Sequence, residues 1–187
     1  MRAFVAVFPP LSVRRALAGA ARELQMAGEV RWVRPENLHL TLKFLGEISD
    51  DDLSLVSGAL EPLGPRYAPF EAGLSGFGAF PSPKRARIVW AGIGEGSEPL
   101  RSLARDVEAS LEPLGFVREG REYTPHLTLG RARGRPVRLG AVESPSALPG
   151  FTVTGVELVE STLGAAGATY STLATYPLSE NGDQGPD

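Results

Sequence analysis

The sequence carries one tetrapeptide pattern twice, as His39-Leu40-Thr41-Leu42 and as His126-Leu127-Thr128-Leu129. These two histidines are the only ones in the chain, and 87 residues separate them. The repeat extends upstream, because residues 28–42 and 115–129 agree at eight of fifteen positions. Chance agreement would give roughly one such position. We therefore infer an internal duplication with one copy of the motif in each half of the chain.

The first copy is preceded by a predicted strand and a predicted helix. Apolar residues at 4–8 indicate a buried strand, and apolar residues at spacings of three and four indicate a helix over 13–27. Ser12 is its expected N-cap and Gly28 its expected end. A further helix should follow the motif, because Ser49-x-x-Asp52 is a capping-box pattern.

The second copy has the same elements in the same order. Residues 87–93 predict a strand, and helical spacing continues over 97–114 with Ser97 as N-cap and Gly115 as the stop. Further strands are expected at 69–79, 151–163 and 169–176.

This order of elements predicts an α+β fold with two similar lobes. We expect two antiparallel-rich sheets that face a central cleft, with helices on their outer sides. Residues 1–178 should form this single bilobal domain, and the polar residues 179–187 a loose tail.

Composition excludes several classes of protein. The chain has 187 residues, 42% of them hydrophobic, with a net charge of −3, so it can bury a core and is not a generally basic protein. It has no cysteine, which excludes disulfides, thiolate metal sites and a cysteine nucleophile. The apolar run at 4–8 is too short for a signal peptide, and no run reaches the ~18 residues of a membrane span. We expect a cytoplasmic monomer.

Alternation along a strand decides which side chains share a face. His39 and Thr41 should lie on one face, with Lys43 beside them, while Leu40, Leu42 and Phe44 should lie on the buried face. The second copy predicts the same separation. If the lobes pack with approximate two-fold symmetry, two imidazoles and two hydroxyls line one cleft.

Two imidazoles beside one reacting atom suit general acid–base catalysis. One ring takes a proton while the other gives one, and imidazole pKa values near 6.5 permit both forms near neutral pH. The hydroxyls of Thr41 and Thr128 can donate to an anionic oxygen without adding charge. A cyclic phosphodiester on a ribose fits such a set. A metal site is disfavoured, because two histidines and two threonines are a thin ligand set.

The two motifs resemble the signature motifs of the 2H phosphoesterase superfamily. The resemblance rests on Arg31–Gly46, which reads RWVRPENLHLTLKFLG, and on Pro125–Arg131, which reads PHLTLGR. More narrowly, the chain is similar to bacterial and archaeal RNA 2′,3′-cyclic phosphodiesterases, also called 2′-5′ RNA ligases. Shorter similar segments are Arg2–Pro9, Gly78–Pro83 and Val89–Gly92.

The resemblance implies hydrolysis of cyclic phosphate ends of RNA to 2′-phosphates without a metal or other cofactor. It implies that His39 protonates the leaving 3′ oxygen and that His126 activates water, an order that the symmetric motifs alone leave open. Thr41 and Thr128 would bind phosphate oxygens. The reverse reaction would join such an end to a 5′ hydroxyl without ATP.

Other candidate residues are secondary. Gly130 could mark a bulge that turns Arg131 toward the phosphate, and Lys43 is a further candidate phosphate ligand. The cations Arg133, Arg135 and Arg138 could follow an RNA backbone or form a solvated loop. Candidates for the cleft rim are Phe80, Trp32 and Tyr123.

Two alternatives remain open at this point. The same chemistry could act on small cyclic nucleotides or on an ADP-ribose cyclic phosphate. A protein of another class, a module that binds RNA ends without turnover, would have no need for two titratable rings.

Overall fold

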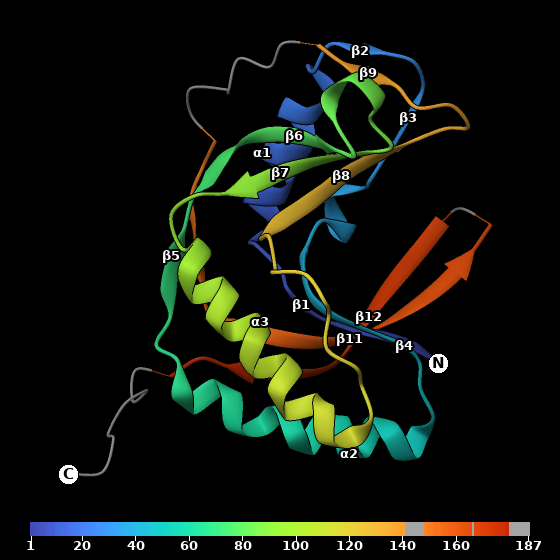
Figure 1. The fold of residues 1–187 in the computed structure, drawn as a ribbon. Helices are drawn as coiled ribbons and strands as arrows, with labels where there is room; N and C mark the ends of the chain where they lie inside the picture. Colours follow the sequence, from blue (N-terminus) through green and yellow to red (C-terminus); the bar gives the residue numbers. More distant parts are fainter. Residues whose placement is uncertain (141–147, 166, 180–187) are drawn as a thin grey trace.

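The computed structural model describes residues 1–140, 148–165 and 167–179, and its centre is an antiparallel sheet (Figure 1). The sheet has eight strands. In spatial order they are β12 (Gly167–Pro177), β11 (Gly155–Gly164), β1 (Arg2–Val7), β4 (Leu40–Glu47), β8 (His126–Ala132), β7 (Ile88–Ile93) and β6 (Leu74–Phe80), with β3 (Val30–Trp32) also paired to β8.

Helices and two small sheets surround this sheet. The helices in the described residues are α1 (Leu11–Arg22), α2 (Asp50–Leu60) and α3 (Ser97–Leu111), with short 3₁₀ helices at Pro35–Asn37, Glu61–Arg66, Pro83–Arg85 and Glu112–Leu114. The small sheets pair β5 (Phe70–Ala72) with β10 (Phe151–Val153), and β2 (Met26–Ala27) with β9 (Arg138–Leu139). The α+β class is confirmed.

The two halves of the sheet meet at a single residue pair. β4 pairs along its length with β1, and β8 pairs with β7, whereas β4 and β8 share the pair Leu40 and Leu127. The sequence predicted two sheets, but the strands of both halves form one continuous sheet. This junction lies next to both histidines, so it places the two motifs side by side.

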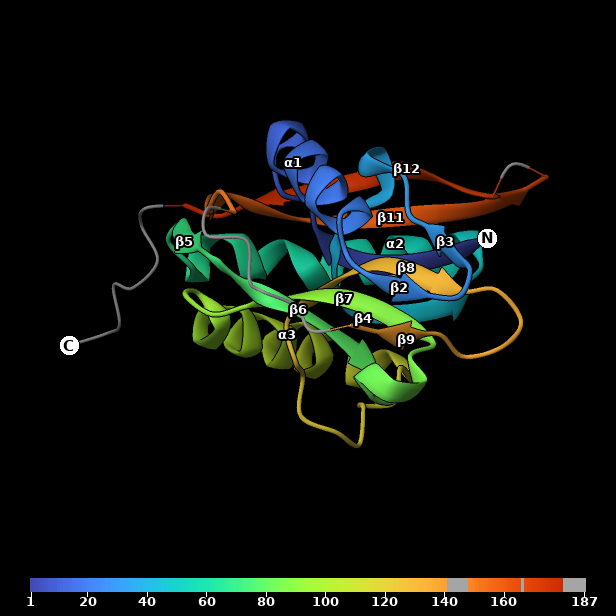
Figure 2. The same cartoon turned by 90° about the horizontal axis from the view of Figure 1, so that it is seen from above.

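The leucines of both motifs enter one hydrophobic core, as alternation predicted. Leu40, Leu42, Leu127 and Leu129 are at most 4% exposed and belong to the same cluster as the buried faces of all three helices. Figure 2 shows α2 and α3 on one side of the strands, where they lie together. Because neighbouring side chains point to opposite faces, the histidines and threonines lie on the face away from this core.

Helix ends differ in part from the expectations. The capping box is confirmed, since Ser49 Oγ accepts from the Asp52 amide at 3.1 Å and Asp52 Oδ2 accepts from the Ser49 amide at 2.9 Å. Ser12 is not a cap, because α1 already begins at Leu11 after Pro10. The helix also ends at Arg22, since the residues before Gly28 pair as β2.

The second helix and the first of the later strands also differ. Gly96, with φ of 76°, is the N-cap of α3 in place of Ser97. The expected strand 69–79 is divided at Gly73 into β5 and β6, which belong to different sheets.

The last described strands form a long hairpin. β11 and β12 extend past the rest of the sheet on the side of β4 (Figure 1). Ser179 donates its amide to the carbonyls of Gly64 and Tyr67, and the rest of the predicted tail, 180–187, lies outside the described residues. In the described part of the chain, every helix is too short or too polar to span a bilayer.

Candidate active site

The antiparallel junction brings the four motif residues onto one patch of the sheet. Leu40 pairs with Leu127, so one step along each strand sets His39 beside Thr128 and Thr41 beside His126. All four side chains face away from the leucine core. The arrangement has an approximate two-fold axis through the leucine pair, and the expected convergence of the two motifs is therefore present.

Both imidazoles are held by the same local hydrogen bond. His39 Nδ1 lies 2.7 Å from the carbonyl oxygen of Asn37, and His126 Nδ1 lies 2.6 Å from that of Thr124. A carbonyl oxygen only accepts, so each Nδ1 carries the proton and each neutral ring has an unprotonated Nε2. The duplicated sequence thus gives both rings the same tautomer and leaves Nε2 for chemistry.

His39 lies in an aromatic cluster that the second motif lacks. Its ring centroid is 4.8 Å from that of Phe4, 5.3 Å from that of Phe8 and 5.2 Å from that of Tyr170. Tyr170 reaches this place from the hairpin strand β12. Sequence reasoning missed Tyr170, because nothing along the chain relates it to a residue 131 positions earlier.

This environment changes the acidity of the ring. Burial lowers the pKa of His39 from 6.5 to about 4, because the charged imidazolium loses water. The hydrogen bond to Asn37 opposes the shift, while the charges of Arg14 and His126 add to it. The free protein therefore holds His39 neutral at pH 7, and the effect of His126 on the pKa of His39 agrees with the closeness of the two rings.

The segment before His39 is tied to two other elements. Asn37 Nδ2 and Arg34 Nη2 donate to the carbonyl of Ala168 in β12, at 2.8 and 3.1 Å. Arg14 of α1 donates to the carbonyl of Glu36 at 2.7 Å. Asn37 is thus held by its side chain while its carbonyl holds His39, and it acts as a positioning residue. In the sequence, the only indication of this role is the position of Asn37 two residues before His39.

His126 lies against a different pair of rings. The centroid of Phe80 is 5.3 Å and that of Trp90 is 6.4 Å from the imidazole. The Trp90 ring packs closely over Gly92, where a Cβ atom would lie 3.1 Å from the ring. Phe80, one of the expected rim residues, is 37% exposed next to this histidine.

A bulge in β4 overturns two expectations. Ala6 pairs with Thr41 but Val5 pairs with Lys43, so Leu42 is an extra residue and the faces exchange beyond it. Lys43 therefore does not share the face of His39: it is 4% exposed, and its Nζ donates to Glu108 Oε1 at 2.9 Å. Phe44, expected in the core, is instead 59% exposed on the histidine face.

A matching bulge in β8 places Arg131. Trp90 pairs with Thr128 but Val89 pairs with Gly130, so the extra residue is Leu129. Arg131 is paired with Ile88, two residues from Trp90, and therefore shares the face of His126. The bulge expected at Gly130 thus occurs one residue earlier, with the expected effect on Arg131.

Two of the rim candidates do not lie on this face. Trp32 packs against the main core, and a Cβ on Gly130 would lie 2.9 Å from its ring. Tyr123 also packs on that core, and burial raises the pKa of its phenol. Both aromatics support the fold and leave Phe80 as the rim residue among the three.

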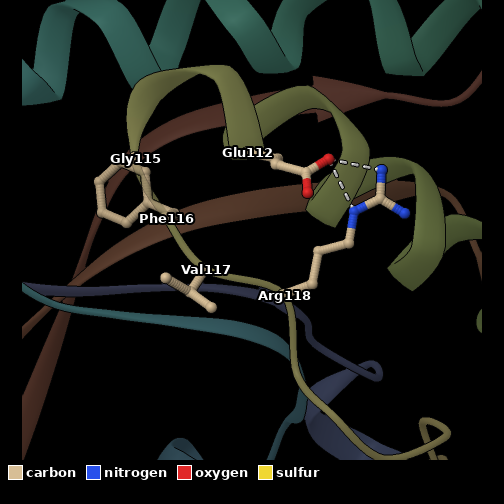
Figure 3. A pocket seen from close by; sticks show the side chains of 5 residues that line it. All are labelled: Glu112, Gly115, Phe116, Val117 and Arg118. Carbon is tan, nitrogen blue, oxygen red and sulfur yellow. Dashed lines mark hydrogen bonds and ion pairs between the residues drawn. The ribbon is translucent and has the colours of Figure 1, made fainter.

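A surface pocket elsewhere contains none of the candidate residues. It has a volume of about 260 Å³ and is lined by residues between Glu112 and Arg118 (Figure 3). Across it, Arg118 Nη2 lies 2.8 Å from Glu112 Oε2, so its charged groups are paired with each other.

The geometry defines a class of protein. One face offers two Nε2 atoms, two hydroxyls and a guanidinium, which is a set for proton transfer around an anionic phosphorus centre. Among the described residues, no group of three His, Cys, Asp or Glu side chains is placed to hold a metal ion. The fold and site are those of a phosphoesterase with a duplicated histidine motif.

The chain belongs to the LigT like phosphoesterase family, whose model matches residues 7–90 and 93–170. Curated relatives agree with this assignment. An RNA 2′,3′-cyclic phosphodiesterase of Methanothermobacter thermautotrophicus is 34% identical over 95% of this chain and 99% of its own. One of Thermus thermophilus with the same name is 35% identical over 95% of this chain and 90% of its own.

Solved structures share the fold. The crystal structure of TT0787 of Thermus thermophilus superposes with a TM-score of 0.77 at 31% identity, covering 96% of this chain and 100% of that one. Escherichia coli LigT complexed with 3′-AMP superposes with a TM-score of 0.80 at 27% identity, covering 96% and 98%.

Proposed function

We propose that this protein hydrolyses 2′,3′-cyclic phosphate ends of RNA to 2′-phosphomonoesters by acid–base catalysis without a metal. The observation that carries the proposal is the shared presentation of the two rings, each with Nδ1 held by a carbonyl two residues upstream and Nε2 free on one face. The names of the relatives, RNA 2′,3′-cyclic phosphodiesterase, support the same substrate.

The reaction needs one proton on the pair of rings. His126 Nε2 takes a proton from water as the water oxygen bonds to phosphorus, and His39 Nε2 gives its proton to the 3′ oxygen as that P–O bond breaks. The products are a 2′-phosphomonoester and a 3′ hydroxyl. With a 5′ hydroxyl in place of water, the same steps join two ends with a 2′-5′ bond and use no ATP.

Binding and charge support these roles. Thr41 and Thr128 donate to the non-bridging oxygens, and Arg131 offsets their charge. His39 is neutral in the free protein because of its burial, so the bound phosphate must raise the pKa of this ring. Binding of the substrate is then coupled to protonation of His39. Since one chain supplies both rings, a monomer suffices, and we propose that it acts in the cytoplasm.

The direct test is turnover of an oligonucleotide with a 2′,3′-cyclic phosphate end in the presence of EDTA. We expect a 2′-phosphate product, and we expect His39→Ala and His126→Ala each to lower turnover by about 10²–10⁴-fold with the fold intact. Near-normal rates in either variant would contradict the proposal. Turnover confined to mononucleotides or ADP-ribose cyclic phosphate would change the substrate, and tight binding without product would indicate a binding module.

A further inference from the structure

Two arginines lie directly opposite each other at the edge of the histidine face. Arg31 of β3 is the cross-strand partner of Arg131 of β8. Val30 and Trp32, which flank Arg31 in β3, pack against hydrophobic clusters. By alternation the Arg31 side chain points to the opposite face, which is the face of Arg131. Both arginines are exposed. Arg31 is therefore a second cation beside the catalytic patch.

Like charges directly opposite each other in a sheet are destabilising. Among residues 1–140, 148–165 and 167–179, no carboxylate lies within 4.0 Å of either guanidinium. An anion placed between the two side chains would remove the repulsion and accept hydrogen bonds from both guanidinium groups.

The opposition is imposed by packing and not by the arginines themselves. A Cβ on Gly130 would lie 2.5 Å from Val30 Cγ1, so the glycine lets β3 approach β8 closely. This contact sets the register that places Arg31 against Arg131. The fold therefore keeps the two charges together at a cost to stability.

The duplicated position in the other half has no such pair. After the matching bulge, the residue five places beyond His39 is Phe44, whereas the residue five places beyond His126 is Arg131. An aromatic side chain thus stands where the other half has a cation. The approximate symmetry is broken at this position, which makes one end of the patch basic and the other apolar.

We propose that Arg31 binds a second phosphate, the one on the 5′ side of the nucleotide that carries the cyclic phosphate, and that Arg131 lies between this phosphate and the reacting one. Across the bulge, Arg131 is about two residues of strand, ~7 Å, from Thr128. That separation is comparable to one nucleotide step. The inference rests on the proposed function and adds that the enzyme senses the 5′ side of its substrate.

The test compares kcat/KM for three probes: adenosine 2′,3′-cyclic phosphate, the same nucleotide with a 5′-phosphate, and a dinucleotide ending in it. The wild type should prefer the phosphorylated probes by about tenfold, which is the effect of one or two charged hydrogen bonds. Arg31→Gln should abolish the preference and leave kcat/KM for the first probe unchanged, and Arg31→Lys should restore part of it. A preference for the dinucleotide alone assigns the subsite to an RNA chain, and a preference for the 5′-phosphate alone assigns it to mononucleotides.

Further readouts separate this subsite from a structural role. Arg31→Gln should raise Tm, because it removes the repulsion, and should reduce the salt slope of kcat/KM for the dinucleotide by about one. Arg15→Gln, which removes an equal charge from the exposed side of α1, should change neither the preference nor the slope. Equal kcat/KM for all three probes in the wild type, or an equal loss on all three in Arg31→Gln, would overturn the proposal. Wild-type protein inactive on every probe would instead contradict the proposed function.

Discussion

At the scale of single residues, His39 and His126 share a tautomer but not an environment. Each Nδ1 donates to a carbonyl two residues upstream, yet His39 alone has Tyr170 from the hairpin and the two phenylalanines of β1 and its following loop around it. The difference is one of hydration. Burial lowers the pKa of His39 to about 4. The protonation state of this ring therefore depends on which groups take the place of water around it.

This shift predicts how stability depends on pH. Between pH 6.5 and about 4 the unfolded chain protonates this histidine while the folded chain does not. The contribution of His39 is therefore fully present above pH 6.5 and is lost as the pH falls toward 4, with a slope of up to about 1.4 kcal/mol per pH unit. Urea unfolding of the wild type and of His39→Phe across this range should show the extra slope in the wild type alone. Equal slopes would contradict a buried neutral ring.

At the scale of elements, the two bulges decide what the motif strands present. Each inserts one residue after the His-x-Thr unit, at Leu42 in β4 and at Leu129 in β8. Alternation therefore predicted the faces correctly as far as each bulge and incorrectly beyond it. The residue that follows differs between the halves. Lys43 reaches α3, whereas Gly130 admits β3 to the sheet.

The buried ion pair of Lys43 gives an element-scale prediction. Its Nζ contacts Glu108 Oε1 at 2.9 Å and the carbonyl of Val117, so it joins β4 to α3 and to the segment after it. Lys43→Met should cost roughly 3–5 kcal/mol of unfolding free energy, because Glu108 loses its partner. The turnover per folded molecule should not change.

The matched control is the double variant Lys43→Met with Glu108→Leu. It should recover most of the lost stability, since no unpaired charge remains. Loss of turnover in the fully folded Lys43→Met protein would contradict a purely structural role for this lysine.

At the scale of the whole molecule, a single site is assembled from both halves of the chain. The junction of β4 with β8 sets the two motifs side by side, and the hairpin and α1 hold the segment before His39 from outside. The two rings should therefore act as a unit on one phosphorus atom. Neither half alone carries a complete pair.

Groups that act as a unit give non-additive losses when they are removed. The double variant His39→Ala with His126→Ala should lose about as much turnover as either single variant, where independent contributions would multiply. Single-turnover rates on a cyclic-phosphate oligonucleotide would measure this, with circular dichroism to verify folding. A double variant whose loss equals the product of the single losses would show that the rings act separately.

The duplication, the α+β class, the leucine core face and the four motif residues could be predicted from the sequence, because they depend on local periodicity and on a repeat that is visible along the chain. Three features required the three-dimensional arrangement: the faces on which Lys43 and Phe44 lie, the packing of Tyr170 on His39, and the pairing of Arg31 with Arg131. A bulge changes register by one residue without a distinct mark in composition. Contacts between distant elements depend on how the whole sheet pairs, which no local pattern encodes.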